Sequence, residues 1–534
     1  MADFGEILRN IGEFGLFQKI TLIALGFTNF FQAFVLGALL FVEPDPERHC
    51  NTDWILQADS NLTTEEQLNL TLPRMEDGTF NRCFMFVPVD WDIGAIREYG
   101  LNETTRCQNG WVYHNTMYEA TIVTDFNLVC NKAHMLQMAQ TMLIAGILVG
   151  SVVFGPVAES FGRKRAVQIG GLIFCIFNII TPLCPNIHFY LACLFLAGFG
   201  GGGYRVSSIV LATEWIGPSK RSWGTCVTTL FSAVGQCVLP GVVYVVRDWR
   251  LSQLILMAPL GVIVFYIWFI PESARWLLSI GRTEEAKREI VKAASINKRP
   301  IPDSLLQKIA VNNAVQKDSI KVIFRSCLLT GSFFTVLVAW FSSNLAIYSL
   351  HFNMGTFGLN IFLIQVLFGV MEIPANLLAV WLLEVFGRRK LIISTLTAGA
   401  LSAAVILAVP QEYAIVVTTL VVSARFFLIW SGTICSVFLQ ELFPTSVRQT
   451  VTALGNMSAR GGGAMAPLLN MLAVFHWVLP IAIFSSLILV SAALCFLLPE
   501  TRRKELPESA ADSKNNRDVT ATTTAGHKQT ETRL

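Results

Sequence analysis

A single arginine lies inside an apolar stretch that is long enough to cross a lipid bilayer. Arg460 occupies the centre of the segment GNMSARGGGAMAP, which runs from Gly455 to Pro467. A charge at mid-membrane costs at least ~2.5–3.5 kcal/mol, and such residues almost always face a bundle interior or a wet cavity. Asn456 precedes Arg460 by one helical turn, so both side chains point the same way. We interpret Arg460 as a functional cation; a structural ion pair with an acid on another helix is the alternative.

Other intramembrane polar residues recur at helical spacing. Gln365, Gly369, Glu372 and Asn376 form one stripe along the segment 358–384, as expected of a cavity-facing side. Three arginines against one well-buried acid leave the predicted centre electropositive, which favours an anionic ligand. The other candidates are Phe341, Asn344 and Tyr348 with the adjacent Trp340 in 328–351, Arg205 in 188–212, and Arg425 and Trp430 in 413–438.

Composition assigns the chain to the membrane proteins. Of its 534 residues 53% are hydrophobic and only 14% are charged, and the mean hydropathy is +0.54; a soluble domain carries about 25% charged residues. Apolar runs of about 20 residues recur, each a candidate transmembrane helix. We find no nucleotide loop, metal-ligand cluster or nucleophile motif in the sequence. The prediction is an all-α membrane protein, not an enzyme, without cofactor or metal.

The apolar runs predict twelve spans in two six-helix halves. Basic clusters all fall on one side of such a chain, which the positive-inside rule makes cytosolic, together with both termini. The predicted parts are a cytosolic N-terminus (1–19), a first half (20–270) containing a long extracellular loop (43–132), a cytosolic linker of helices (271–327), a second half (328–498) and a disordered cytosolic tail (499–534).

The long loop carries the signals of an oxidising, glycosylated compartment. It contains four cysteines, which the sequence alone could pair in three ways. Three glycosylation sequons, at Asn61, Asn69 and Asn102, lie in the same loop. The loop is therefore expected outside the cell, in agreement with the charge rule.

One short loop motif appears in both halves. Each copy has an acid, then a glycine for a tight turn, then basic residues that could pair with acids at neighbouring helix ends. Its repetition at matched positions argues against ordinary positive-inside charge. We predict gating loops formed by Glu159, Gly162, Arg163 and Lys164 in the first half and by Glu384, Gly387, Arg388 and Arg389 in the second.

These loops resemble the signature of the major facilitator superfamily, transporters built of two six-helix halves. Five further motifs resemble the organic anion, cation and zwitterion transporters of solute carrier family 22, over about residues 1–505. Within that family, two stretches look closest to the branch of organic anion transporter ten, known for urate and nicotinate exchange, and its testis paralogue, known for riboflavin. The motifs are DFNLVC (125–130), TEW (213–215), PESARWL (271–277), ELFPTSVRQT (441–450) and LPET (498–501), and the two stretches are 50–102 and 292–297.

The resemblance implies roles for individual residues. Disulfides are implied between Cys50 and Cys107 and between Cys83 and Cys130. Arg460 matches the family position that contacts an anionic substrate, and Trp340, Phe341 and Tyr348 would stack on a flat ring. Glu372 and Arg425 are expected to form a structural pair. The chain departs from anion-transporting members at Asn376, where a Lys or Arg is usual, and at Gly432 and Leu230, where aromatic residues are usual. The resemblance assigns no role to Arg205, which could replace the missing charge or pair with a carbonyl oxygen.

The function expected is a multi-pass plasma-membrane exchanger of small organic anions such as urate, nicotinate or related aromatic and mono-carboxylates, working by alternating access as a monomer. An organic cation, zwitterion or vitamin carrier of the same fold is the alternative, and a receptor or enzyme is a third class. The expected partners are the substrate, a counter-anion and the bilayer, without nucleic acid. The C-terminal residues Thr532 and Leu534 also match a ligand of PDZ scaffold domains.

Overall fold

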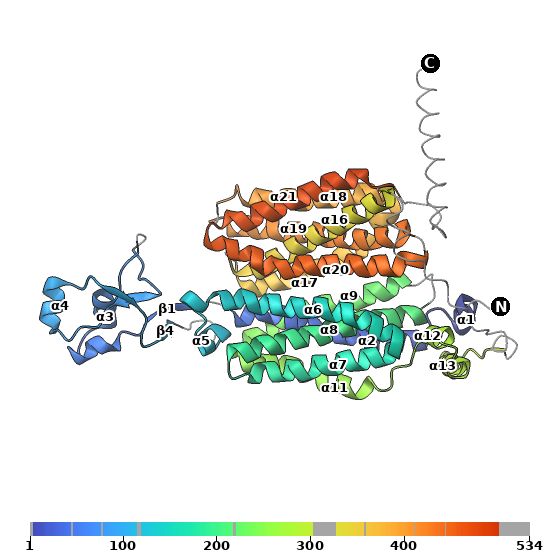
Figure 1. Ribbon diagram of the computed structural model, residues 1–534, viewed down its shortest axis with the longest axis horizontal. Helices are drawn as coiled ribbons and strands as arrows, with labels where there is room; N and C mark the ends of the chain where they lie inside the picture. Colours follow the sequence, from blue (N-terminus) through green and yellow to red (C-terminus); the bar gives the residue numbers. More distant parts are fainter. Residues whose placement is uncertain are drawn as a thin grey trace, which may run out of the picture.

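The computed structural model describes most of the chain. The described residues are 4–43, 46–75, 78–114, 119–216, 221–302, 327–356, 359–410, 412–443 and 445–500. Two bundles of long helices lie side by side in Figure 1, the first half in blue to green and the second in yellow to red. A small lobe projects from one end, and the short helices α1, α12 and α13 lie at the other end. We call residues 46–130 the cap, the end that carries them the cap end, and the opposite end the linker end.

Long helices supply nearly all of the described structure. The first half consists of α2 (Leu16–Val42), α6 (His134–Phe161), α7 (Arg163–Ile180), α8 (Ile187–Trp215), α9 (Arg221–Val245), α10 (Trp249–Met257) and α11 (Leu260–Tyr266). The second half consists of α16 (Cys327–Phe352), α17 (Ile361–Phe386), α18 (Arg388–Ile406), α19 (Ala414–Leu442), α20 (Thr445–Asn470) and α21 (Val478–Leu494). The linker end has α1 (Phe4–Ile11), α12 (Ala274–Ser279) and α13 (Thr283–Ile296). Short 3-10 helices follow several of the long helices: η3 (Thr181–Leu183), η5 (Met354–Thr356), η6 (Met471–Val474) and η7 (Cys495–Leu497).

Eleven segments of the described residues are long and apolar enough to cross a membrane. One of them runs from Trp249 to Tyr266 and joins α10 to α11, which Pro259 separates. The helix α20 is not among the eleven, because its Gly, Asn and Arg residues lower its hydropathy. This 26-residue helix nevertheless packs against α16 and α6. Together with α20, the spans form the predicted twelve-helix architecture.

Glycines decide how closely the helices of one half approach. A Cβ atom at Gly146 or Gly150 of α6 would lie 2.1 Å from the carbonyl oxygen of Phe195 or Phe199 of α8. Gly202 of α8 lies equally close to the backbone of α6. Small residues allow such backbone contact between membrane helices. The glycine run of α8 is therefore explained by helix packing.

The two halves meet along two pairs of helices. The helix α9 packs against α17, and α6 packs against α20. At the cap end, the ring of Phe362 at the start of α17 stacks on Phe41 of α2, with ring centroids 5.1 Å apart, and meets the edge of Tyr244 of α9 at 5.6 Å. These aromatic contacts join the two halves at the cap end of α17.

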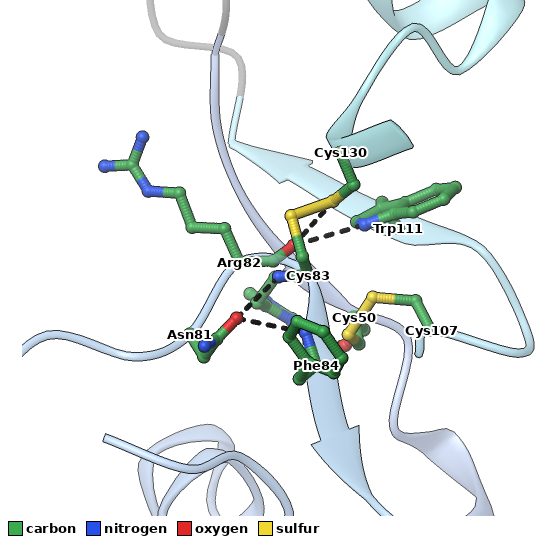
Figure 2. Close-up of a disulfide and its surroundings, with 9 residues drawn as sticks. Cys50, Asn81, Arg82, Cys83, Phe84, Cys107, Trp111 and Cys130 are labelled. Atoms are coloured by element: carbon green, nitrogen blue, oxygen red, sulfur yellow. Dashed lines mark hydrogen bonds between the residues drawn. A yellow bond between two sulfur atoms is a disulfide. The ribbon is translucent and has the colours of Figure 1, made fainter. Parts of the chain in front are cut away.

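The cap adds a small amount of β-structure to the all-α plan. Strand β1 (Glu47–Cys50) pairs antiparallel with β4 (Trp111–His114), and β2 (Phe84–Phe86) with β3 (Thr104–Arg106). Disulfides join Cys50 to Cys107 and Cys83 to Cys130, the pairs that the family resemblance implies (Figure 2). The remaining cap elements are η1 (Asp53–Gln57), α3 (Thr64–Thr71), α4 (Ile93–Tyr99), α5 (Ile122–Phe126) and η2 (Cys130–Lys132).

Hydrogen bonds fix the loop around the second disulfide. The side-chain oxygen of Asn81 accepts hydrogen bonds from the backbone N–H groups of Cys83 and Phe84, at 2.9 and 3.0 Å (Figure 2). The indole N–H of Trp111 donates to the carbonyl oxygen of Arg82 at 3.2 Å. The cap is thus held by covalent and polar contacts around a small apolar cluster, since it has little core of its own.

Candidate functional site

The repeated loops of the two halves place arginines beside acids at the linker end. In the first half, Arg163 donates through Nε and Nη2 to one carboxylate oxygen of Glu214 at 3.3 and 3.2 Å. The backbone N–H of Lys164 donates to Glu272 at 3.0 Å. Gly162 has φ +106°, and a Cβ there would lie 2.6 Å from Glu272, so only glycine fits this turn.

The second half repeats this arrangement. Arg388 donates through Nη2 to Glu441 at 2.8 Å, and the backbone N–H groups of Arg388 and Arg389 donate to Glu500 at 2.9 and 3.1 Å. Gly387 has φ +84° and packs against the Glu500 carboxylate. The four acids lie in the TEW, PES, ELF and PET motifs, so the motif residues are the partners of the loop residues. Glu159 is exposed, and the side chain of Glu384 lies outside the described residues.

Burial raises the pKa of Glu272 above its ordinary value, although the backbone N–H groups of Lys164 and Ser273 oppose this effect by binding the charged form. The carboxylate lies at the first turn of α7, where the helix dipole favours negative charge. The repeated loops therefore fix helix ends within each half.

Within the second half, the glycines of α20 receive the aromatic side chains of α16. A Cβ at Gly455 would lie 2.7 Å from the ring of Trp340, and one at Gly463 would lie 2.8 Å from the ring of Tyr348. A Cβ at Gly462 would lie 2.3 Å from the carbonyl oxygen of Phe341. The predicted stacking rings thus pack against α20; Phe341 and Tyr348 remain half-buried, and Trp340 is buried.

Arg460 has a neutral partner. Its Nη1 donates to the hydroxyl oxygen of Tyr348 at 3.1 Å, and no acid of the described residues pairs with it. Asn456, one turn away, is exposed and donates to the carbonyl oxygen of Thr452 of its own helix. The other guanidinium N–H groups of Arg460 donate to no acceptor among the described residues.

Arg425 lies in a buried network. Its Nη1 donates to Nδ1 of His351 at 3.1 Å, and its guanidinium carbon lies 4.3 Å from the ring centroid of Phe368. Its Nη2 is 3.9 Å from the Glu372 carboxylate, the pair that the sequence suggested. Gln236 lies between the two: its side chain donates to Glu372 at 2.7 Å and accepts from Arg425 at 3.3 Å. The pair is therefore shared with an amide from the first half.

The polar stripe of α17 faces the first half. A Cβ at Gly369 would meet Cys237 and the backbone of Ala233 of α9. Gln365 is fully buried, and neither polar atom of its side chain has a hydrogen-bond partner among the described residues. Asn376 donates to the carbonyl oxygen of Glu372 of its own helix, as Asn344 does to that of Trp340.

Trp430 and Arg205 occupy different surroundings. Trp430 packs in a separate cluster with Ala375 of α17 and tilts against Phe426, with ring centroids 4.9 Å apart. Arg205 of α8 is half-buried, and no described residue accepts a hydrogen bond from its guanidinium. Arg460 and Glu372 of the second half lie close enough to interact electrostatically with Arg205, so it faces the interface between the halves.

Sequence reasoning missed the acids of the loop networks and also Gln236 and His351. Gln236 follows Gly235 within an apolar run, so its polarity was a usable signal. The spacing of residues along α9 does not tell which helix faces Gln236, because that contact depends on the tertiary structure.

The remaining predicted sites lie in the cap and tail. Asn61, Asn69 and Asn102 are exposed, as glycosylation would require, and Asn69 accepts a hydrogen bond from Arg74 at 2.6 Å. Thr532 and Leu534 lie outside the described residues. Within the described residues, no group of three His, Cys, Asp or Glu could hold a metal ion.

Comparisons with known proteins agree with this architecture. A family model described as "Sugar (and other) transporter" matches residues 84–512. Human solute carrier family 22 member 13 is 35% identical over 514 residues, 96% of this chain and 93% of that protein. Member 6-B from Xenopus laevis is 31% identical, over 99% of this chain and 98% of that protein.

The solved structures that match are transporters of the same fold. A proton:xylose symporter of the major facilitator superfamily, bound to 6-bromo-6-deoxy-D-glucose, matches with TM-score 0.58 at 16% identity, over 91% of this chain and 98% of its own. The two-half bundle, the repeated loop networks and the relatives that match over almost the full chain lead to one assignment. The chain belongs to solute carrier family 22 of the major facilitator superfamily, and it is a multi-pass membrane transporter of organic ions, not an enzyme.

Proposed function

We propose that this transporter exchanges small organic anions across the plasma membrane. The observation that carries the proposal is the state of Arg460: its described partner is the neutral hydroxyl of Tyr348. Burying a guanidinium in a low-dielectric site costs desolvation free energy, and pairing with an anion offsets that cost. A carboxylate, or the delocalised charge of urate, accepts two parallel hydrogen bonds from such a group. Arg460 is the proposed anion contact.

The charges between the halves support an anion over a cation. Arg205 and Arg460 have no acidic partner among the described residues, while Arg425 shares Glu372 with Gln236. Three guanidiniums therefore face one carboxylate, and that carboxylate is already hydrogen-bonded. Arg205 comes from the first half and Arg460 from the second, so one anion between them would contact both halves.

Alternating access provides the transport cycle. The halves meet along α9 with α17 and α6 with α20, and the candidate residues lie on these helices or on α8, α16 and α19. Rocking of one half against the other would expose Arg460 to each side in turn. Partly exposed aromatic side chains such as Phe341 and Tyr348 would border a flat ring, which favours urate, nicotinate or related aromatic carboxylates as substrates.

An organic cation or zwitterion carrier is the second candidate. It would need an acid available to the substrate at the interface, and Glu372 already accepts a hydrogen bond from Gln236. Asn376 has no charge where anion-transporting members usually carry a cation, and this departure keeps the alternative open to test.

Uptake by membrane vesicles that contain the full chain tests the proposal. Labelled urate and nicotinate should enter when a counter-anion is inside, and a labelled quaternary amine should not. Arg460→Ala should abolish anion uptake at an unchanged surface level, while Arg460→Lys should retain a part, since lysine lacks the bidentate fork. Arg247→Gln is a matched control, because Arg247 is exposed at the cap end. Normal uptake by Arg460→Ala, or uptake of the amine alone, would contradict the proposal.

The remaining assignments are proposals of the same kind. The cap would be extracellular and glycosylated at Asn61, Asn69 and Asn102, and the linker end with both termini would be cytosolic. The transporter would act as a monomer, and the terminal Thr532 and Leu534 would bind a PDZ scaffold. Adding one alanine after Leu534 should abolish that binding, because it moves the terminal carboxylate out of register.

A further inference from the structure

We propose that Gln236 is a latch between the two halves: its amide stabilises the conformation closed at the cap end by bridging Arg425 and Glu372. The inference rests on alternating access, as given in the proposed function, but not on which ion is carried. It assigns a positioning role to a residue of α9 that carries no charge and has not been placed in substrate binding.

Two hydrogen bonds of the Gln236 side chain form the bridge. The side-chain amide N–H of Gln236 donates to Glu372 at 2.7 Å, and its oxygen accepts from Arg425 Nη2 at 3.3 Å. Only this orientation of the amide suits both partners, because a carboxylate accepts and a guanidinium donates. Both ends of the amide are used, so its position is determined by two charged groups.

Gln236 and its two partners come from different halves. Arg425 and Glu372 both belong to the second half, and Arg425 is further fixed there by His351 and the ring of Phe368. Gln236 alone comes from the first half. The network therefore joins the halves through one neutral residue. Hydrogen bonds to charged groups are stronger than those between neutral groups, and the more so in a buried site.

The two charged groups have an alternative arrangement without Gln236. Arg425 Nη2 and the Glu372 carboxylate are 3.9 Å apart, which is longer than a hydrogen bond. Each of the two groups instead forms a hydrogen bond with the Gln236 amide. If Gln236 withdraws, the two charged groups can pair directly without leaving their half. The network thus has two satisfied states, one with the halves joined and one with them apart, as a conformational switch requires.

Opening at the cap end would act on the bridge through α9. The aromatic contacts at the cap end involve Tyr244 of α9 and Phe362 of α17, the same two helices. Tyr244 is eight residues beyond Gln236, about 12 Å along a helix. Separation of α9 from α17 at the cap end would therefore strain the bridge, so loss of the bridge should favour opening on that side.

The experiment uses a cysteine reporter that needs no substrate. Phe41 is buried, 2% exposed, against Phe362, so in Phe41→Cys the thiol should react with a membrane-impermeant thiosulfonate added on the cap side only when that side opens. The cap cysteines are disulfide-bonded. Among the free cysteines of the described residues, Cys237 is half-buried, and five are buried: Cys175, Cys184, Cys193, Cys435 and Cys495. Labelling is measured per molecule at the cell surface, and labelling of the chain with Phe41 intact is subtracted.

Two variants are compared in the Phe41→Cys background. Gln236→Leu keeps the size of the side chain but removes the amide, and labelling should become at least threefold faster. The exchanged pair Gln236→Glu with Glu372→Gln moves the carboxylate to α9, so that Arg425 pairs across the halves. Labelling of the exchanged pair should be no faster than that of the Phe41→Cys parent.

The outcomes separate the latch from a purely structural role. Unchanged labelling of Gln236→Leu, or labelling of the exchanged pair above the parent rate, would overturn the latch. If Gln236→Leu does not reach the surface, the exchanged pair decides alone by the same criterion. Since labelling requires no transport, a failure of anion uptake would remove the proposed substrate class and leave this result intact.

Discussion

Glu272 accepts a hydrogen bond of 3.0 Å from the backbone N–H of Lys164, 108 residues earlier in the chain. In the second half Glu500 accepts from Arg388 and Arg389 in the same way. Each carboxylate lies at the N-terminal turn of a long helix, α7 or α18, where unsatisfied N–H groups and the helix dipole favour an anion. These contacts stay within one half, so in this conformation the repeated loops brace each half.

Loss of one acid from these loops should destabilise the protein. Arg163 and Glu214 have side chains only 11% and 15% exposed, so Glu214→Gln leaves a nearly buried guanidinium unpaired. Removing one partner of a buried pair costs about 3–5 kcal/mol, and we expect surface expression to fall several-fold. The control Glu285→Gln breaks a pair with Arg282 that is about half exposed, and it should have little effect. Equal expression of the two variants would contradict this assignment.

Gly462 should be intolerant of any side chain, unlike its neighbour. A Cβ at Gly462 would lie 2.3 Å from the Phe341 carbonyl oxygen, which cannot move without shifting α16, whereas at Gly461 the nearest atom is 3.9 Å away. Gly462→Ala should therefore lower the thermal stability of the purified transporter, and Gly461→Ala should leave it nearly unchanged. Overpacking of this kind costs about 1–3 kcal/mol. Similar melting temperatures for both variants would refute close packing of α16 on α20.

Glu372→Gln should harm folding or trafficking more than substrate choice. It leaves Arg425 without a carboxylate in a buried network, at a cost of about 3–5 kcal/mol. Combining Glu372→Gln with Arg425→Gln removes both charges, so the double variant should be expressed better than either single variant. Surface biotinylation measures this directly. A double variant that is worse than both would mean that the charges are not coupled.

Glu43, just after α2 at the cap end, should make stability depend on pH. Burial raises its pKa to about 8 from the ordinary 4.5, although a hydrogen bond from Gln140 opposes the shift. Between these values the folded state holds a proton that the unfolded state releases, so stability is full below pH 4.5 and is lost as pH rises through about 8. Since one pKa unit corresponds to 1.36 kcal/mol, the wild type should lose up to about 4 kcal/mol relative to Glu43→Gln between pH 5 and 8.

Thermal unfolding of both proteins in detergent at pH 5, 6.5 and 8 measures this difference. The two unfolding temperatures should diverge as the pH rises, with Glu43→Gln the more stable at pH 8. Parallel changes with pH in the two proteins would assign the dependence to other groups.

The aromatic residues of α16 illustrate the limit of sequence reasoning. Their spacing placed Phe341 and Tyr348 on one helical face, and both are indeed half-buried. It could not tell that the glycines of α20 would occupy that face, because the contact joins residues more than 100 positions apart. Spacing also could not tell that Trp430, another candidate for ligand binding, packs beside Ala375 of α17, because its orientation depends on the rotation of α19 within the bundle.

The acids of the loop networks were visible as motif residues but not as partners. Glu214, Glu272, Glu441 and Glu500 all lie within motifs that carry the family resemblance. Their pairing with Arg163, Lys164 and Arg388 depends on how helix ends converge at the linker end. The pairing of the cap cysteines also could not be derived from their spacing, because four cysteines allow three pairings. The family resemblance selected the pairing that the structure has.

The sequence by itself determined the class of protein, because hydropathy over twenty residues and the position of charges depend only on local composition. It also located Arg460, since a lone cation among glycines in an apolar run is unusual wherever it lies. The tertiary structure alone decided the chemistry around that residue. It gave Arg460 a phenol instead of a carboxylate as partner, and it inserted Gln236 of one half between Arg425 and Glu372 of the other. Which charges are compensated depends on distances of a few ångströms between helices far apart in the chain, and no local pattern encodes those distances.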